Sequence, residues 1–208
     1  MALLDEFIGQ VDQALKTLTG KHTPRRTYPA ENMVDSILNE EEGQHAAGLM
    51  RVNHTGEICA QALYEGQALT AENDEVRKSL ILAAAEESDH LAWCEQRLDE
   101  LGSKPSVLNP LFYVASYAMG AVTGLFGDKV SLGFVEATED QVCQHLERHL
   151  DSLPESDERS REIVRRMHED EARHGSDALQ AGGKEFPEPV KRTMALVSKV
   201  MTETTYRI

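Results

Sequence analysis

The chain has 208 residues and a formal net charge of −15 at pH 7, so it is poorly suited to binding nucleic acid or attaching to anionic lipid through basic residues. A chain of this length can form one domain with a sizeable core. Its three cysteines, Cys59, Cys94 and Cys143, form neither a disulfide framework nor a C-x-x-C site, which indicates a reducing compartment.

Residues 1–26 predict a peripheral amphipathic helix followed by a loop. Apolar side chains occur at helical spacing, at Leu4, Phe7, Ile8, Val11, Leu15 and Leu18. We expect this helix to pack on the rest of the protein, with docking on a partner as the alternative. Because Asp5 and Glu6 stand early, with no basic region before an apolar block, no signal peptide or transit segment is expected.

Two long helices joined by a short turn are expected next. The first begins near Asn39, with acidic residues favourable in its first turn, and ends near Thr70. Gly56 costs about 1 kcal/mol in a helix relative to alanine, which indicates close approach of another group to that face. Tyr64 lies on the same face as Glu57, and we interpret it as a core residue or as a hydrogen-bond donor near a metal ligand.

The second helix is expected to begin at Asn73 or Asp74 and to end near Leu101. One stripe of it is apolar except for Glu87 and His90, and a solvated charged face would not show that pattern. The apolar members of the stripe are Leu80, Ala83, Ala84, Leu91, Cys94 and Leu98. Trp93 falls off this stripe, so we expect it to pack at an edge.

Residues 110–126 form a stretch of seventeen residues without a charge. A helix needs about twenty apolar residues to span a bilayer, so this stretch is short for that purpose. Gly120 and Gly124 give a G-x-x-x-G spacing, which allows close helix packing. We interpret residues 109–127 as an apolar crossover at a membrane interface, able to admit a greasy ligand. A buried crossover helix is the alternative.

A third bundle helix is expected from Gly127-Asp128 to about Leu150. Glu139 falls in line with its apolar residues more squarely than Glu136, and it is the preferred metal ligand. His145 and His149 are interpreted as residues that support a metal ligand, or as exposed histidines.

The fourth bundle helix is expected over residues 156–179. His174 is preferred over His168 as a ligand because it repeats an earlier motif. After Pro187 and Pro189, residues 188–205 predict a last amphipathic helix. Its apolar residues are Val190, Met194, Leu196, Val197, Val200 and Met201.

The repeated motif is E-x-x-H, found as Glu87 to His90 and again as Glu171 to His174. Residues i and i+3 share one face of a helix, so each motif presents a carboxylate beside an imidazole. A single such motif would be a weak signal, typical of a solvated face.

Two further glutamates strengthen the pattern. Glu57 and Glu139 precede the two motif glutamates by 30 and 32 positions, and the midpoints, 72 and 155, fall in turn-rich sequence. Two antiparallel hairpins would therefore bring all four carboxylates to one height, about 22 Å from the turns. We thus predict a single all-α domain over residues 1–208, a ferritin-like four-helix bundle with a dinuclear metal site, an apolar crossover helix and additional N- and C-terminal amphipathic helices.

The predicted ligands are Glu57, Glu87, His90, Glu139, Glu171 and His174. Four carboxylates balance the charge of two divalent ions. Carboxylates and imidazoles without a thiolate favour iron or manganese over structural zinc.

The stretch Arg51-Val-Asn-His-Thr-Gly-Glu57 resembles the demethoxyubiquinone hydroxylase family, whose helix carries R-V-[DN]-H-x-G-E. The likeness continues through both E-x-x-H motifs and the stretch from Asn109 to Ala121, and it covers most of residues 45–180. In that family a histidine follows the third-helix glutamate by six residues, as His145 follows Glu139. The resemblance implies a di-iron monooxygenase that hydroxylates a polyprenyl demethoxy-quinol with O₂ in ubiquinone biosynthesis.

The resemblance also implies cofactors and partners: two iron ions, NADH as a candidate electron source, and the quinol and O₂ as substrates. The apolar helices indicate contact with a membrane surface, at the cytoplasmic face of a bacterial cell membrane. A homo-oligomer and a lipid-handling helper protein are further candidate partners. The chain contains no G-x-G-x-x-G unit for a nicotinamide domain.

The rival interpretations are an iron-storage or peroxide-scavenging protein of the same fold, a manganese catalase, and a non-catalytic quinone- or lipid-binding module.

For the hydroxylase, we expect Glu57, Glu87 and His90 mainly to hold one ion, and Glu139, Glu171 and His174 the other. Some of the carboxylates should bridge the two ions.

Overall fold

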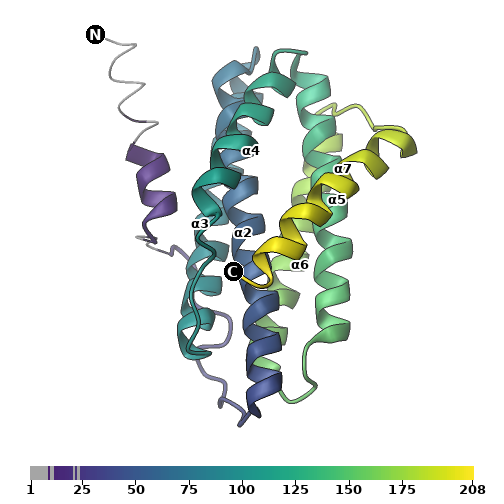
Figure 1. Cartoon of the computed structure of the whole chain (residues 1–208). Helices are drawn as coiled ribbons and strands as arrows, with labels where there is room; N and C mark the ends of the chain where they lie inside the picture. The colour runs from purple at the N-terminus through teal and green to yellow at the C-terminus, as the bar shows by residue number, and fades with distance from the viewer. Residues whose placement is uncertain (1–8, 10–11, 21, 23) are drawn as a thin grey trace.

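The computed structural model describes residues 9, 12–20, 22 and 24–208 of the chain. These residues form helices and connecting segments, and no strand occurs among them. The helices are α2 (Glu40–Thr70), α3 (Asp74–Glu100), α4 (Asn109–Gly124), α5 (Asp128–Ser152), α6 (Glu158–Gln180) and α7 (Glu188–Thr205). Figure 1 shows α2, α3, α5 and α6 standing side by side as an antiparallel bundle, with α4 in the crossover between its two hairpins. The predicted ferritin-like bundle is confirmed.

Local sequence explains where the bundle helices begin and end. Asn39 and Glu42 form a capping box at the start of α2, and the side chain of Asn73 caps α3. Asp157 caps α6 through the backbone N–H of Ser160. Gly182 follows the end of α6 and has a φ of +100°, in the left-handed region, which is a common way to terminate a helix. The helix boundaries predicted from turn and cap residues are therefore confirmed.

The core contains two large apolar clusters with a polar layer between them, and a third, smaller cluster that includes Ile58. In each bundle helix, the predicted ligands lie between residues of one cluster and residues of the other. The first cluster includes Met50, Cys94, Leu98, Leu146, Val164 and Met167, and the second includes Ala60, Tyr64, Leu80, Ala84, Val135 and Ala178. The equal-height argument from sequence thus corresponds to a real layer inside the bundle.

Helix α4 packs directly on α2 through glycines. A Cβ atom at Gly66 would collide with the backbone of Tyr117, and one at Gly120 would collide with the Leu63 carbonyl. The predicted close packing of Gly120 and Gly124 is confirmed. At Gly56, by contrast, a Cβ atom would meet nothing within 4 Å, so the close approach predicted there is wrong.

The outer face of α4 is apolar and exposed, so the alternative of a buried crossover helix is wrong. Leu111 and Val114 of α4, and Leu125 and Phe126 directly after its end, are each at least 65% exposed. The side of α4 that carries the glycines packs against α2. In the described part of the chain, no other helix covers the opposite side. None of the described helices is long and apolar enough to cross a bilayer.

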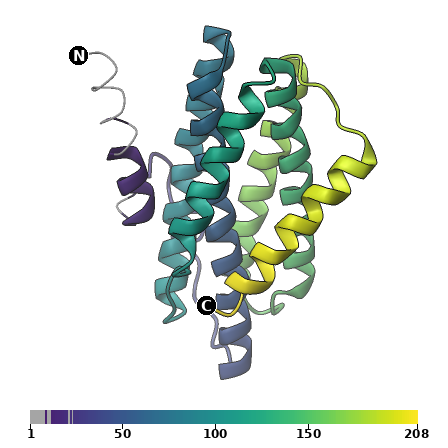
Figure 2. The same cartoon turned by 45° about the horizontal axis from the view of Figure 1, so that its top comes forward.

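Helix α7 lies diagonally on the same side of the bundle as α4, as Figures 1 and 2 show. It is attached near its two ends. Lys191 pairs with Glu136 at 3.0 Å, while Tyr206 contacts His45 through its hydroxyl and Arg51 through its carbonyl. Leu196, Val197 and Val200 are exposed apolar residues between those ends. Together with Val190, which is also exposed, we call them the α7 stripe.

The segment before α2 packs along α3 and buries Trp93. Tyr28 and Ala30 belong to the same apolar cluster as Trp93, whose side chain is 2% exposed. The prediction that Trp93 packs at an edge is therefore wrong, because α3 is covered on a second side. Of the predicted N-terminal helix, residues 12–18 are helical, and Leu18 packs against a small apolar cluster with Ile58. Leu4, Phe7, Ile8 and Val11 lie outside the described residues.

Candidate metal centre

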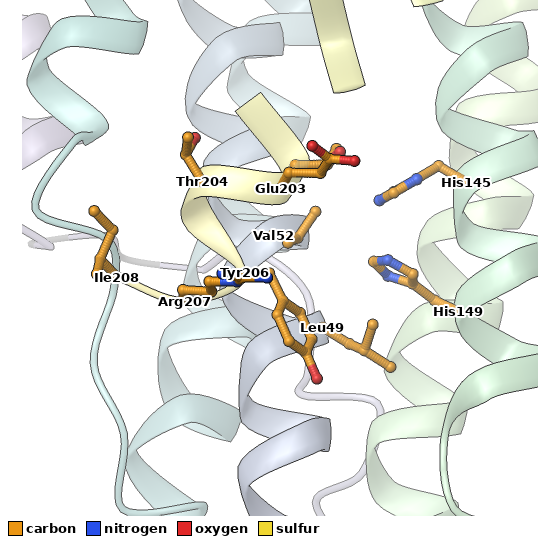
Figure 3. A pocket seen from close by; sticks show the side chains of 10 residues that line it. Leu49, Val52, His145, His149, Glu203, Thr204, Tyr206, Arg207 and Ile208 are labelled. Atoms are coloured by element: carbon orange, nitrogen blue, oxygen red, sulfur yellow. The ribbon is translucent and has the colours of Figure 1, made fainter. Parts of the chain in front are cut away.

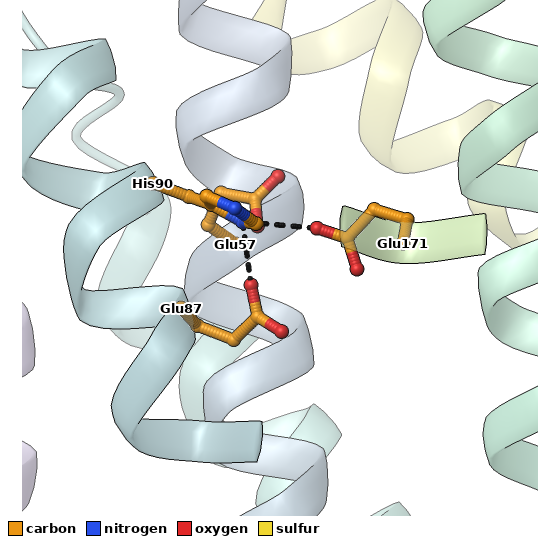
Figure 4. Close-up of side chains that lie close together, drawn as sticks. All are labelled: Glu57, Glu87, His90 and Glu171. Atoms are coloured by element: carbon orange, nitrogen blue, oxygen red, sulfur yellow. Dashed lines mark hydrogen bonds and ion pairs between the residues drawn. The ribbon is translucent and has the colours of Figure 1, made fainter. Parts of the chain in front are cut away.

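Four of the predicted ligands surround a single point in the polar layer. Glu57, Glu87, His90 and Glu171 are all buried, and one ligand atom from each lies within 4.8 Å of the others. Nδ1 of His90 is 3.3 Å from a Glu57 oxygen, 2.9 Å from a Glu87 oxygen and 2.9 Å from a Glu171 oxygen (Figure 4). One ring nitrogen can serve only one oxygen by hydrogen bonding. The crowding of three carboxylates around it is therefore the arrangement expected around a cation.

His174 forms a second focus next to the first. Its Nδ1 is 3.1 Å from Oε2 of Glu171 and 3.3 Å from Oε1 of Glu87. Both glutamates use the opposite oxygens, Oε1 of Glu171 and Oε2 of Glu87, toward His90. Glu87 and Glu171 thus each present one oxygen to each histidine, which is the placement required of carboxylates that bridge two ions.

Glu139 lies on the His174 side of the layer. It is 1% exposed, and its charge interacts with those of Glu171, Glu87 and His174. The hydroxyl of Tyr64 donates a short hydrogen bond to Oε1 of Glu139. Tyr64 is therefore both a core residue and the hydrogen-bond donor to a predicted ligand, the two interpretations made from its sequence position.

The outer nitrogen of each histidine bonds to an acidic residue that sequence reasoning missed. Nε2 of His90 lies 3.1 Å from Asp170, and Nε2 of His174 lies 2.8 Å from Glu86. With its Nε2–H given to a carboxylate, each imidazole turns the Nδ1 lone pair toward the cluster. Asp170 and Glu86 each directly precede a motif glutamate and serve the histidine of the other motif. The acidic residue before each E-x-x-H was the available signal.

The charges in the layer depend strongly on one another. Burial raises the pKa of Glu57 and of Glu139 well above the usual value, and the neighbouring Glu171 and Glu87 add to this. Burial by itself would raise the pKa of Glu87 as well, but hydrogen bonds from His174 and His90 outweigh this effect and lower the pKa below its usual value. Against the effect of burial, carboxylates around His174 raise its pKa to about 12, and those around His90 raise its pKa well above 6.5.

The donor set fits a pair of hard or borderline cations. Oε1 of Glu87, Oε2 of Glu139 and Oε1 of Glu171 are buried and have no hydrogen-bond partner in the described part of the chain. Two of them lie near a histidine nitrogen, but not in hydrogen-bonding geometry. Buried carboxylate oxygens without a donor are costly unless a cation faces them. Six oxygen and nitrogen ligands with no thiolate match iron or manganese.

The rejected sequence candidates lie elsewhere. Glu136 pairs with Lys191, and His168 lies 3.2 Å from Glu147 at the surface.

His145 does not contact the proposed ligands. Its ring lies against that of His149, tilted by 58° with the ring centroids 4.1 Å apart, and its Nδ1 accepts a hydrogen bond from Arg148. The contact expected of His145 as a support for the metal ligands is therefore not formed.

His145 and His149 line a pocket of about 720 Å³ under the end of α7 (Figure 3). Leu49 and Val52 of α2 and the C-terminal residues 202–204 and 206–208 form its other walls. Burial lowers the pKa of His145 to about 4 and that of His149 to about 3, so both rings are neutral at pH 7. Figure 3 shows both rings turned toward this pocket.

Comparison of the sequence with known proteins identifies a family. The family model described as ubiquinone biosynthesis protein COQ7 matches residues 44–205. The chain is 57% identical over 206 residues to the 3-demethoxyubiquinol 3-hydroxylase of Pseudomonas aeruginosa (strain LESB58), covering 99% of this chain and 96% of the relative. It is 59% identical, with the same coverage, to the enzyme of that name from Ectopseudomonas mendocina.

A third relative of that name, from Stutzerimonas stutzeri, is 58% identical over 205 residues, covering 98% of this chain and 95% of the relative. These matches extend over nearly the whole chain and confirm the resemblance inferred from the motifs. The chain belongs to the ubiquinone biosynthesis protein COQ7 family.

Proposed function

We propose that this protein is a 3-demethoxyubiquinol 3-hydroxylase, a di-iron monooxygenase acting in ubiquinone biosynthesis. The observation that carries the proposal is the buried layer in which Glu87 and Glu171 each face both His90 and His174. The relatives that share the name 3-demethoxyubiquinol 3-hydroxylase match nearly the full chain, so the whole bundle supports the same activity.

The six residues have distinct tasks in this proposal. Glu57 and His90 would help to hold one iron ion and Glu139 and His174 the other, while Glu87 and Glu171, which face both histidines, would contribute to holding both ions. Bound iron supplies the O₂ chemistry, in which one oxygen atom enters the ring, the other leaves as water, and two electrons are consumed. We propose NADH as the source of those electrons.

The rest of the layer keeps the ligands in place and excludes water. Asp170 and Glu86 hold the Nε2–H of the two histidines, so that Nδ1 is free to bind a metal. Tyr64 holds Glu139 by one oxygen and leaves the other free. The apolar clusters on both sides of the layer keep solvent from the reacting groups.

We further propose that the protein is peripheral at the cytoplasmic face of a bacterial cell membrane. The exposed apolar residues of α4 and the α7 stripe support this, because they lie on one side of the bundle. Exposed apolar surface of this kind is typical of an interaction site, and a polyprenyl tail resides in lipid. An iron-storage protein in a water-soluble shell has no need of such a surface.

The proposed activity is tested by loading the protein with Fe²⁺ and supplying a short-chain demethoxy-quinol and ¹⁸O₂. A product that gains one ¹⁸O atom supports the hydroxylase. Formation of a mineral core without product would support storage instead. Glu139→Ala should abolish product and lower the iron content, whereas the matched change Glu136→Ala on the same helix should retain both. Normal turnover by Glu139→Ala would refute the ligand assignment.

Membrane contact is tested by flotation with vesicles of phosphatidylethanolamine and phosphatidylglycerol. Leu125→Glu should reduce the bound fraction, because it places a charge in the exposed apolar surface at the C-terminal end of α4. Leu82→Glu is the control, since Leu82 is exposed to a similar degree on α3. Equal loss of flotation by the two variants would contradict a specific role for α4.

A further inference from the structure

The two histidines of the metal centre rest on outer carboxylates of very different exposure. Asp170, which accepts from His90, has a side chain that is 3% exposed. Glu86, which accepts from His174, has a side chain that is 37% exposed, and its own partner Arg173 is 46% exposed. The support of His90 is therefore buried, while that of His174 is partly in solvent.

Arg26, in the segment before α2, completes the buried support. Its Nη1 donates to Oδ2 of Asp170 at 2.6 Å, and its Nε donates to Oδ2 of Asp89 at 2.8 Å. The backbone N–H of Arg25 donates to the other oxygen of Asp89 at 2.6 Å. The planar guanidinium thus holds two carboxylates from two bundle helices, α3 and α6, at once.

The same guanidinium also contacts the ring that flanks His90. Its Cζ lies 4.7 Å above the centre of the Trp93 ring, and the centre of that ring is 5.3 Å from the centre of His90. Arg26 therefore acts on His90 by two routes, through Asp170 at the outer nitrogen and through Trp93 at the ring face. No such residue from outside the bundle reaches His174 among the contacts of the described chain.

Oδ2 of Asp170 receives hydrogen bonds from both Arg26 and His90, so its position depends on both. Without Arg26, the remaining cations of Asp170 are Arg166 and Arg173, which are largely exposed and lie at its other oxygen, Oδ1. The carboxylate would then be drawn toward Oδ1 and away from His90.

We propose that Arg26 is a positioning residue for His90, and that it makes the metal position beside His90 tighter and slower to release its ion than the position beside His174. This inference rests on the proposed metal centre. Arg26 lies outside residues 44–205, the stretch that the family model matches. The segment before α2 is thereby assigned a role in metal retention.

The test uses full-length protein loaded with Zn²⁺ as a redox-inert probe, followed by release of zinc to an excess of chelator. The wild type should release its two ions in two phases. Arg26→Gln should accelerate the slow phase about tenfold, the lower end of the range for outer partners of ligating histidines. Arg26→Lys should restore part of the effect, because an ammonium can pair with Asp170 but cannot span both carboxylates. Arg166→Gln, which touches the same carboxylate at Oδ1, should change neither phase.

A second readout separates positioning from general stability. In ¹⁵N-histidine-labelled zinc protein, the Nε2–H of His90 should exchange slowly with solvent in the wild type and rapidly in Arg26→Gln. If Arg26→Gln lowers only the unfolding temperature of the metal-free protein, while zinc release and the His90 signal remain unchanged, the proposal is wrong. A single release phase in the wild type would also refute it. Failure to bind two ions at all would instead refute the metal centre, and with it the proposed function.

Discussion

Replacing Tyr64 with phenylalanine tests the arrangement around Glu139 most directly. The Tyr64 hydroxyl is the donor to Oε1 of Glu139, and Oε2 has no donor in the described part of the chain. Phenylalanine keeps the ring in the apolar cluster but leaves both oxygens without a hydrogen bond. Losing a buried hydrogen bond to a charged group costs about 2 kcal/mol. For a protein of this size, that corresponds to a fall of about 4–8 °C in the unfolding temperature.

The measurement is thermal unfolding of the metal-loaded protein by circular dichroism, together with metal affinity by competition with a chelator. Affinity should fall about tenfold, because Tyr64 orients a ligand. Tyr113→Phe is the matched control, since Tyr113 donates to Glu65 at 2.5 Å away from the metal layer. It should reduce stability without changing metal affinity. Equal effects of the two variants on affinity, or an unchanged unfolding temperature for Tyr64→Phe, would refute this reasoning.

Three further predictions concern packing, pH and metal removal. Gly120→Ala should destabilise the protein by about 1–3 kcal/mol in urea unfolding, because its Cβ would collide with the Leu63 carbonyl, whereas Gly43→Ala, with open space around it, should stabilise by up to about 1 kcal/mol. Burial raises the pKa of Glu65 from 4.5 to about 6, so folding loses stability as pH rises through that window. Glu65→Gln should therefore be up to about 2 kcal/mol more stable than wild type at pH 7 and equally stable at pH 4. Equal stability of the two proteins at pH 7 would contradict the raised pKa of Glu65. Removing metal with a chelator should lower the unfolding temperature, which should then rise with the logarithm of added Fe²⁺ concentration under anaerobic conditions, and a constant value would argue against a site in the folded state.

The positions of the bundle helices and the height of the predicted metal layer could be predicted from the sequence. Asn39 and Asn73 mark helix starts because a side chain can cap only the helix that follows it locally. Glu57 and Glu139 were found because a residue and its partner in a hairpin are equidistant from the turn. The choice of Glu139 over Glu136 used helical periodicity together with the six-residue spacing to His145 that the family resemblance implies, and the structure buries the first and pairs the second with Lys191. These are short-range rules, which a single sequence contains.

Tertiary structure alone decided the contacts between distant segments. Asp170 serves His90 and Glu86 serves His174 because α3 and α6 face each other, which no spacing along the chain reveals. Trp93 is buried, and Arg26 reaches the centre, because the segment before α2 happens to lie along α3. His145 turns to the pocket under α7, although its spacing from Glu139 suggested otherwise. Helical periodicity tells which side of a helix is apolar, but the partner on each side is chosen by packing among all the helices at once.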